Sequence, residues 1–311
     1  MTNTHPTPRF GLIGTGVWPR LVQAPAAAAS RAVTFTSVFN RDAAKADAFA
    51  APFGVRGFAD LDAFLDSVDI VGITVPPAVQ PFYALRAAKA GKPVALEKPL
   101  AIDPVEAEEI AAAFAARGLA AIVFFTRMLI PESRAWIDAA QAQGGWLAGR
   151  VDSIGGLLND KTNPFYSTAV AWRGEAGALW DSAPHSVSTL LTILGEVAEV
   201  SAVRGQGDLK LLTLGHKSGA VSSIAMAMDA PVNLPGETAL FGAAGKSVMP
   251  PSLDWFADAT VAYGIALDIL ADSLAGKARS AFPDARLGAA VTKILAAAER
   301  SLASGHRVDL G

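Results

Sequence analysis

The sequence predicts an α/β fold in two parts, an N-terminal doubly wound parallel sheet and a C-terminal α+β domain with a mostly antiparallel open sheet. In the first 125 residues, short continuous apolar runs alternate with helical stretches. Such runs are typical of parallel strands that helices cover on both faces. Beyond residue 126, several strand patterns follow one another without helices between them, which indicates antiparallel neighbours. We therefore expect two domains, at residues 1–125 and 126–311.

The elements of the first domain follow in order along the chain. Its expected strands lie at residues 10–13, 33–39, 68–75, 94–96 and 121–125. Its expected helices lie at residues 21–29, 43–51, 61–65, 79–90 and 104–117. Asp103 is a suitable N-cap for the last helix, and Pro104 is a favourable first helical residue.

The second domain is expected to begin with two or three helices, around residues 131–143 and 177–194. The strand patterns that follow lie at residues 199–204, 209–214, 220–228 and 237–241. Residues 216–219 separate two of these patterns and predict a hairpin turn. Long helices at residues 257–274 and 285–302 are expected to close the chain.

Composition limits the classes of protein to consider. The chain has 311 residues, of which 51% are hydrophobic and 18% charged, so it can bury a substantial core. A formal net charge of −3 gives no reason to expect a nucleic-acid partner. The absence of cysteine excludes disulfides and thiolate metal sites. No apolar stretch predicts a membrane helix and the first eight residues predict no secretory signal, so we expect a cytoplasmic protein without a membrane partner.

The first motif is Gly11-Leu-Ile-Gly14-Thr-Gly16, between an expected strand and an expected helix. In that context glycines permit a tight turn and close approach of the backbone to a pyrophosphate at the helix N-terminus, which is typical of a Rossmann dinucleotide site. Pro19 stands where a third small residue is usual, so helix packing there is expected to differ. A glycine-rich structural turn is the alternative interpretation. The candidate cofactor contacts here are Gly14, Thr15, Gly16, Val17 and Trp18.

The end of the second strand bears on which dinucleotide is bound. An acidic residue there usually holds the adenosine ribose and repels a 2′-phosphate, but this chain has Asn40 followed by Arg41. A guanidinium forms charge-assisted bonds to phosphate, so this pair favours NADP. The alternative is that Asp42 is the ribose ligand, with NAD as the cofactor, and that Arg41 is a solvated loop charge.

Two further strands end at the same edge of the predicted sheet. Thr74 and Pro76 follow one of them, and Glu97-Lys98-Pro99 follows the next. Because ligands bind at the carboxyl edge of open α/β sheets, we expect Thr74, Pro76, Glu97 and Lys98 to line the cofactor cleft.

The third motif is Gly177-Ala-Leu-Trp-Asp181-Ser-Ala-Pro-His185. Asp181 and His185 are four residues apart, which places them on one face if the segment is helical. A histidine exchanges protons near neutral pH, and a carboxylate one turn away can orient it. A capping pair or half of a metal site are the alternatives, but four histidines and no cysteine leave few metal ligands, and no metal is expected. His216 and His306 are expected to be structural.

Together these motifs resemble the glucose–fructose oxidoreductase / inositol dehydrogenase / MocA (Gfo/Idh/MocA) oxidoreductase family. The resemblance covers nearly the whole chain, including residues 124–127 and Trp172-Arg173. It implies that Lys98 is the catalytic lysine, with a Lys98–Pro99 bond that is commonly cis in the family. Pro19 departs from the pattern, and so does Gln80, which stands where many relatives have histidine.

The resemblance implies an NAD(P)-dependent dehydrogenase or reductase that transfers a hydride between the nicotinamide and a secondary hydroxyl or ketone of a sugar, cyclitol or related polyol. His185 would accept the hydroxyl proton, Lys98 would stabilise the reacting oxygen and Asp181 would orient the groups. Arg127 and Trp172 are candidate substrate contacts. The open face of the second sheet would pair subunits into a homodimer or homotetramer. A non-catalytic dinucleotide-binding regulator and a reductase of C=N or enone bonds are the alternatives.

Overall fold

The chain folds into two compact units. The computed structural model describes residues 7–163, 165–166, 174–231, 234–277 and 282–311. The first unit comprises Met1–Ala101, Val105–Leu129 and Asp254–Arg286. The second comprises Ile102–Pro104, Ile130–Leu253 and Leu287–Gly311. This differs from the expected division into residues 1–125 and 126–311, because helix α10 (Trp255–Leu274) packs with the helical segments that follow the glycine motif.

The first unit contains the predicted Rossmann-type sheet. Six parallel strands lie in the order β3-β2-β1-β4-β5-β6. They are β1 (Arg9–Ile13), β2 (Thr34–Phe39), β3 (Arg56–Phe58), β4 (Ile70–Ile73), β5 (Val94–Leu96) and β6 (Ala121–Val123). The doubly wound parallel sheet is therefore confirmed. Sequence analysis missed β3, whose three residues include a glycine and an exposed arginine.

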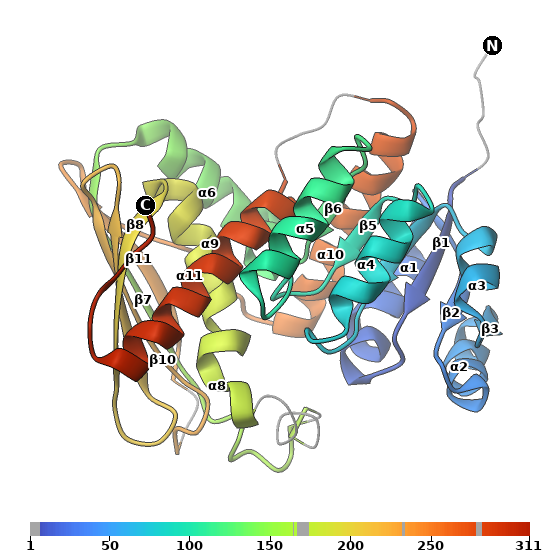
Figure 1. Cartoon of the computed structure of the whole chain (residues 1–311), viewed down its shortest axis with the longest axis horizontal. Coiled ribbons are helices and arrows are strands. Elements are labelled where there is room, and N and C mark those ends of the chain that lie inside the picture. The colour runs from blue at the N-terminus through green and yellow to red at the C-terminus, as the bar shows by residue number, and fades with distance from the viewer. Residues whose placement is uncertain (1–6, 164, 167–173, 232–233, 278–281) are drawn as a thin grey trace. The chain divides into compact units, whose positions relative to one another are not determined.

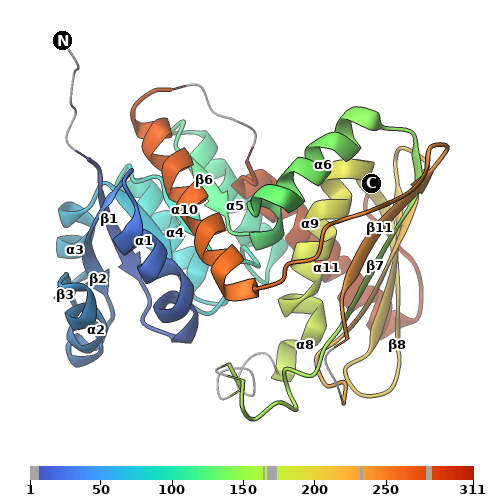
Figure 2. The same ribbon diagram turned by 180° about the vertical axis from the view of Figure 1, so that it is seen from behind.

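Helices cover both faces of this sheet. They are η1 (Pro19–Gln23), α1 (Ala24–Ala29), α2 (Ala43–Ala50), α3 (Leu61–Ser67), α4 (Gln80–Lys89) and α5 (Pro104–Ala115), with single turns at η2 (Ala51–Phe53) and η3 (Thr126–Met128). Helices α1 and α10 lie on one face, and α4 and α5 lie on the other (Figures 1 and 2). Within the described residues, no helix is long and apolar enough to cross a membrane.

Two glycines allow the helices to approach the sheet closely. A Cβ on Gly11 would lie 2.6 Å from Val68 and 2.7 Å from Phe64, at the α3 side of the sheet. On the α10 side, a Cβ on Gly72 would collide with the hydroxyl of Tyr263 and the ring of Phe10. Glycine at these positions therefore sets the layer spacing on each face.

The second unit is built on a seven-stranded sheet in the order β12-β11-β7-β10-β9-β8-β13. Its strands are β7 (Trp146–Ile154), β8 (Val197–Arg204), β9 (Lys210–His216), β10 (Val221–Ala227), β11 (Glu237–Gly242), β12 (Gly245–Val248) and β13 (Val308–Asp309). Only β7 and β10 pair in parallel, and every other pairing is antiparallel. The predicted mostly antiparallel sheet is thus confirmed, as is the turn that joins β9 to β10.

The helices of this unit lie on one face of its sheet, and the described chain places none on the other (Figures 1 and 2). They are α6 (Pro131–Gln143), α8 (Gly174–Asp181), α9 (Ala183–Leu194) and α11 (Ala285–Ser304). Strand β7, near the middle of the sheet, was not predicted. Its helix-facing Gly149 touches the sheet-facing side of α9 so closely that an added Cβ would lie 2.6 Å from Leu190.

Tyr263 provides a test of the packing between α10 and the first sheet. Its side chain is fully buried, and its hydroxyl has no hydrogen-bond partner among the described residues. Burial, with a smaller contribution from the charge of Glu97, raises the pKa of this phenol well above its usual value. We expect Tyr263→Phe to leave the free energy of unfolding unchanged or to raise it by about 1–3 kcal/mol, because an unsatisfied hydroxyl is removed.

Denaturant unfolding measures this effect. Tyr83→Phe is the control, because Tyr83 is also buried but its hydroxyl is not a buried atom that lacks a partner. A loss of more than about 1 kcal/mol in Tyr263→Phe alone would show that the hydroxyl contributes a favourable interaction.

Candidate active site

The glycine motif forms an open loop at the carboxyl end of β1. Gly14 has φ +117°, and its N–H donates to the carbonyl of Phe39 at 3.1 Å. A Cβ at this position would collide with the carbonyl oxygen of Thr74, so only glycine fits. Gly16 is exposed, and the nearest atom to an added Cβ would be 3.9 Å away on Pro19. The loop thus leaves room for a phosphate to approach the backbone, as a dinucleotide requires.

The helix after the loop begins with a widened turn. Pro19 is buried at the start of the π-helical segment η1, and the N–H of Ala24 reaches back five residues to its carbonyl. The altered packing expected at Pro19 therefore takes the form of a π-turn. Just before it, the Trp18 indole donates to Oε1 of Glu97 at 2.8 Å.

Asn40 links the glycine loop to the end of β2. Its Nδ2 donates to Oγ1 of Thr15 at 2.6 Å, and its Oδ1 accepts the N–H of Asp42 at 2.9 Å. The Asp42 carboxylate caps α2 by accepting the N–H of Lys45 at 3.2 Å. Arg41 is exposed, and its guanidinium makes no ion pair or hydrogen bond within the described part of the chain. Of the groups at this strand end, Arg41 is therefore the one that remains available to a ligand.

The carboxylate of Glu97 joins three segments of the first unit. Its Oε1 accepts from the Trp18 indole and from Nε2 of Gln23, the latter at 2.6 Å. Its Oε2 accepts the backbone N–H of Lys98 at 3.3 Å. Gln23 is buried and also accepts from the hydroxyl of Thr74, at the end of β4. Gln23 was not predicted, because its position in a helix gives no sign of this tertiary contact.

Gln80 holds the loop that carries Lys98. Its fully buried side chain donates to the carbonyls of Glu97, Pro99 and Leu100 at 2.8, 3.1 and 3.0 Å. Its Oε1 accepts the N–H of Glu97 at 3.1 Å. The glutamine that stands where many relatives have histidine thus binds the loop of Lys98. The Lys98–Pro99 bond within this loop is cis. Pro76 contributes its carbonyl, which accepts the N–H groups of Val79 and Gln80 at the start of α4.

Arg127 lies at the same sheet edge, in the turn after β6. Its guanidinium is 5.6 Å from the ring centroid of Trp255, and burial lowers its pKa. Strands β5 and β6 are neighbours with Leu96 opposite Val123, and the N–H of Phe124 donates to the carbonyl of Leu96 at 2.7 Å. The loops that carry Lys98 and Arg127 therefore leave the sheet side by side.

In the second unit, the histidine motif is anchored at Gly177. This residue interrupts α8 with φ +64°, and an added Cβ would collide with the carboxylate of Asp208. That carboxylate accepts the N–H of Ala178 at 2.9 Å and pairs with the buried ammonium of Lys210. Asp208 was not predicted, although Gly177 in a helical pattern was a signal of a special backbone.

Asp181 and His185 lie on either side of the boundary between α8 and α9. Ser182 separates the two helices, and the N–H of His185 donates to its carbonyl at 3.3 Å. The His185 carbonyl accepts from the hydroxyls of Ser188 and Thr189, each at 3.0 Å. Both candidate side chains are half-buried.

The predicted residues divide between the two units. The first unit carries the predicted cofactor contacts at the carboxyl ends of four strands, namely Gly14, Thr15, Gly16, Val17, Trp18, Asn40, Arg41, Thr74, Pro76, Glu97 and Lys98. Asp181 and His185 belong to the second unit, and Arg127 to the first. Trp172 lies outside the described residues.

Two other histidines have structural positions. His216 is buried, with Nδ1 2.8 Å from the Gly195 carbonyl and Nε2 2.9 Å from the Ser222 hydroxyl, and burial lowers its pKa. His306 is exposed, and its carbonyl accepts from the Ser301 hydroxyl at 2.8 Å. Among the described residues, no group of three or more His, Asp or Glu side chains has an arrangement that could hold a metal.

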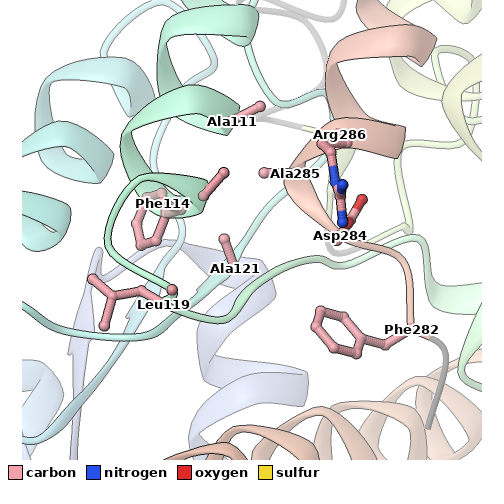
Figure 3. Close-up of a pocket in the computed structure, with 10 residues that line it drawn as sticks. Ala111, Phe114, Leu119, Ala121, Phe282, Asp284, Ala285 and Arg286 are labelled. Atoms are coloured by element: carbon pink, nitrogen blue, oxygen red, sulfur yellow. The ribbon is translucent and has the colours of Figure 1, made fainter. Parts of the chain in front are cut away.

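A pocket of about 570 Å³ lies elsewhere in the first unit. Its lining includes Phe114, Leu119 and Ala121, and Arg286 points toward Asp284 beside it (Figure 3). Ala121 is the first residue of β6, so this pocket is at the amino edge of the sheet, opposite the edge that carries Lys98. It is therefore separate from the candidate active site.

The parallel sheet and the open glycine loop define a dinucleotide-binding protein. Residues 8–125 match the model of the Gfo/Idh/MocA oxidoreductase family with an NAD-binding Rossmann fold. This match to residues 8–125 agrees, for the first domain, with the resemblance seen in the motifs.

Individual relatives are distant. The chain is 27% identical to Oxidoreductase P35 of Formosa agariphila over 61% of its own length and 62% of the relative, which is less than two thirds of that protein. It is 26% identical to a dTDP-3,4-didehydro-2,6-dideoxy-α-D-glucose 3-reductase of Streptomyces antibioticus, over 78% of this chain and 75% of the relative. Its fold is similar to that of the WlbA dehydrogenase from Bordetella pertussis, solved with NADH and UDP-GlcNAcA, with a TM-score of 0.82, 22% identity and 99% of each chain covered.

The contacts of Gln80 lead to a prediction about the Lys98 loop. Gln80→Met keeps the side-chain volume but leaves buried carbonyls without donors, so the free energy of unfolding should fall by at least about 2 kcal/mol. Amide exchange at Glu97 and Lys98 should also become faster. Denaturant unfolding and hydrogen exchange measure the two effects.

Gln141→Met is the matched control, because the exposed Gln141 makes one hydrogen bond, to the Thr192 carbonyl at 2.9 Å. Unchanged stability and exchange in Gln80→Met would mean that Gln80 does not hold the loop.

Proposed function

We propose that this protein is an NAD(P)-dependent dehydrogenase or reductase acting on a secondary hydroxyl or ketone of a sugar, cyclitol or related polyol. The observation that carries the proposal is the attachment of Lys98 to the dinucleotide loop. Glu97 binds both Trp18 of that loop and the N–H of Lys98, so a cation is held where the nicotinamide end of the cofactor would reach.

The residues of the first unit fit a dinucleotide. Gly14 and Gly16 would receive the pyrophosphate, with Thr15, Val17 and Trp18 around it. Asn40 and Arg41 would face the adenosine ribose, and Thr74, Pro76 and Glu97 would line the remainder of the edge. The bound cofactor would supply a hydride acceptor or donor.

The proposed roles of the polar groups follow from their chemistry. In oxidation, His185 would accept the proton of the hydroxyl oxygen, the carbon that bears this oxygen would lose a hydride to the oxidised nicotinamide, and a ketone would form. Lys98 donates a hydrogen bond to the reacting oxygen and stabilises its developing negative charge. Asp181 orients the substrate or the cationic group, and Arg127 and Trp172 complete the substrate contacts. The sugar nucleotides named for the Streptomyces and Bordetella relatives support a polyol-like substrate.

A turnover screen tests the class of reaction. Sugars, cyclitols and their ketones are offered with NAD(H) and NADP(H), alongside imines and enones. Oxidation or reduction of a polyol or its ketone supports the proposal. Turnover of imines or enones alone, or cofactor binding with no turnover, would refute it.

Substitution of the two proton-handling groups should separate their roles. Lys98→Met should lower turnover about 10²–10³-fold by removing the donor to the reacting oxygen. His185→Asn should lower oxidation about 10²–10⁴-fold. In the unsubstituted enzyme, kcat/KM for oxidation should rise with pH and level off once the base is neutral, and this limb should flatten in His185→Asn.

Steady-state kinetics across pH measure both variants, with cofactor titration and melting temperature as controls for folding. Persistence of the same pH limb in His185→Asn would assign the base to another residue. Near-normal turnover in Lys98→Met would remove the lysine from the chemistry.

The cofactor preference proposed here is NADP. Arg41 has no other partner in the described chain, while Asn40 and Asp42 are engaged with Thr15 and α2. Arg41→Ala should weaken NADPH binding by about 1.5–3 kcal/mol, the range for hydrogen bonds to charged groups, and leave NADH binding nearly unchanged. Fluorescence titration of both cofactors measures the difference. Equal losses for the two would contradict the assignment.

The open face of the second sheet is proposed as the surface that pairs subunits. Neighbouring strands place apolar side chains on it, including Val203, Leu211 and Val221, which are 59%, 47% and 49% exposed. Val203 and Leu211 are directly opposite each other in the register of β8 and β9. Burial of apolar surface is favourable, and exposed apolar patches mark interaction sites.

Leu211→Arg should convert the oligomer to a monomer, as measured by light scattering after size exclusion. Leu253→Arg is the control, because this leucine is 94% exposed and lies outside the sheet. A monomeric wild-type protein, or an oligomer that survives Leu211→Arg, would refute this surface.

A further inference from the structure

Arg127 is a partly buried cation without a counter-ion in the described chain. The side chain is half-buried, and burial is the cause of its lowered pKa. Its contact is with the ring of Trp255, and no described carboxylate forms an ion pair or hydrogen bond with it. The nearest acid along the chain from Trp255, Asp254, caps α10 through the N–H groups of Phe256 and Ala257.

The contacts of Arg127 do not offset the cost of removing its guanidinium from water. Moving a charged group out of water is costly unless an opposite charge or hydrogen-bond acceptors replace the water. A cation–π contact recovers only part of that cost. A bidentate anion would recover more, because a guanidinium presents its donors as a planar fork.

The location of Arg127 points to the substrate rather than the cofactor phosphates. The loop of Arg127 leaves the sheet beside the loop of Lys98, because β5 and β6 are paired. The glycine loop follows β1, and strands β4 and β5 lie between β1 and β6. Three strand spacings are about 14 Å, so a pyrophosphate at Gly14 and Gly16 would be distant from Arg127.

We propose that Arg127 binds an anionic substituent, a carboxylate or a phosphate, on the substrate that reacts at Lys98. This inference rests on the proposed function and narrows its substrate class to acidic polyols, such as sugar acids or phosphorylated sugars. Arg127 would act in substrate binding, through two parallel hydrogen bonds, and would leave the hydride transfer itself to the groups around Lys98.

The experiment compares matched ligands on the NADP-loaded protein. D-Glucose, D-glucuronate and D-glucose 6-phosphate share one ring and differ in their charge. Calorimetric titration should give tighter binding for one or both anions than for glucose. Arg127→Met should weaken that anion by about 30-fold or more, the fold-change expected for truncating one partner of a buried charge pair, and should leave glucose unchanged. The difference between D-glucuronate and D-glucose 6-phosphate shows whether a carboxylate or a phosphate is bound.

Two further variants control for folding and for cation–π contacts. Arg127→Lys keeps the charge without the planar fork and should recover only part of the affinity. Arg56→Met removes a guanidinium that lies 4.5 Å from the Phe58 ring centroid, on strand β3 at the far edge of the sheet, and should change none of the titrations.

Equal binding of charged and neutral ligands would overturn the proposal, and so would equal losses for all three in Arg127→Met. If none of the three binds, inorganic phosphate is the probe, and it should raise the melting temperature of wild type but not of Arg127→Met. Failure of that shift also overturns the proposal. If anions bind through Arg127 but no polyol is turned over, the proposed function alone is refuted. If polyols are turned over without a preference for anions, this inference alone is refuted.

Discussion

The arrangement of the first unit depends on one carboxylate, that of Glu97. It accepts hydrogen bonds from Trp18 in the glycine loop, from Gln23 in the helix that follows and from the N–H of Lys98. Hydrogen bonds to an ionised acceptor are stronger than neutral ones, and several together fix its position. Gln23 extends this network to Thr74 at the end of β4. A shift of the glycine loop would therefore disturb the lysine loop as well, because one carboxylate holds both.

Helix α10, from late in the chain, packs on one face of this sheet, and its first residues reach the carboxyl ends of the strands. Tyr263 packs edge-on against Phe10 and Phe124, with ring centroids 6.3 and 5.0 Å away. At the start of the same helix, Phe256 lies 6.4 Å from Trp18 and Trp255 covers the guanidinium of Arg127. One helix from late in the chain thus contacts the sheet core, the glycine loop and the turn after β6. Its buried apolar face explains why α10 packs with the first unit rather than with its sequence neighbours.

The parts of the fold with a strong local signal were predictable. Buried parallel strands such as β1 and β4 read as continuous apolar runs, and Gly14 marked the loop because its backbone excludes any side chain. Strand β7 was missed because Arg150 and Asp152 interrupt its apolar pattern on the exposed face. Gln23 and Gln80 act through contacts 51 to 74 and 17 to 20 residues away along the chain, and no local pattern encodes such contacts.

In the histidine motif, some residues hold the backbone in place and others are the candidates for chemistry. Gly177 is required by its positive φ and by the approach of Asp208, and the N–H of Ala178 is held by that carboxylate. Trp180 is buried and donates to Glu299 at 2.7 Å. These three positions fix the helix in the second unit as Glu97 and Gln80 fix the lysine loop in the first. Asp181 and His185 are only half-buried on a segment that its neighbours already hold. The roles proposed for Asp181 and His185 therefore depend on a backbone that Gly177, Ala178 and Trp180 fix in place.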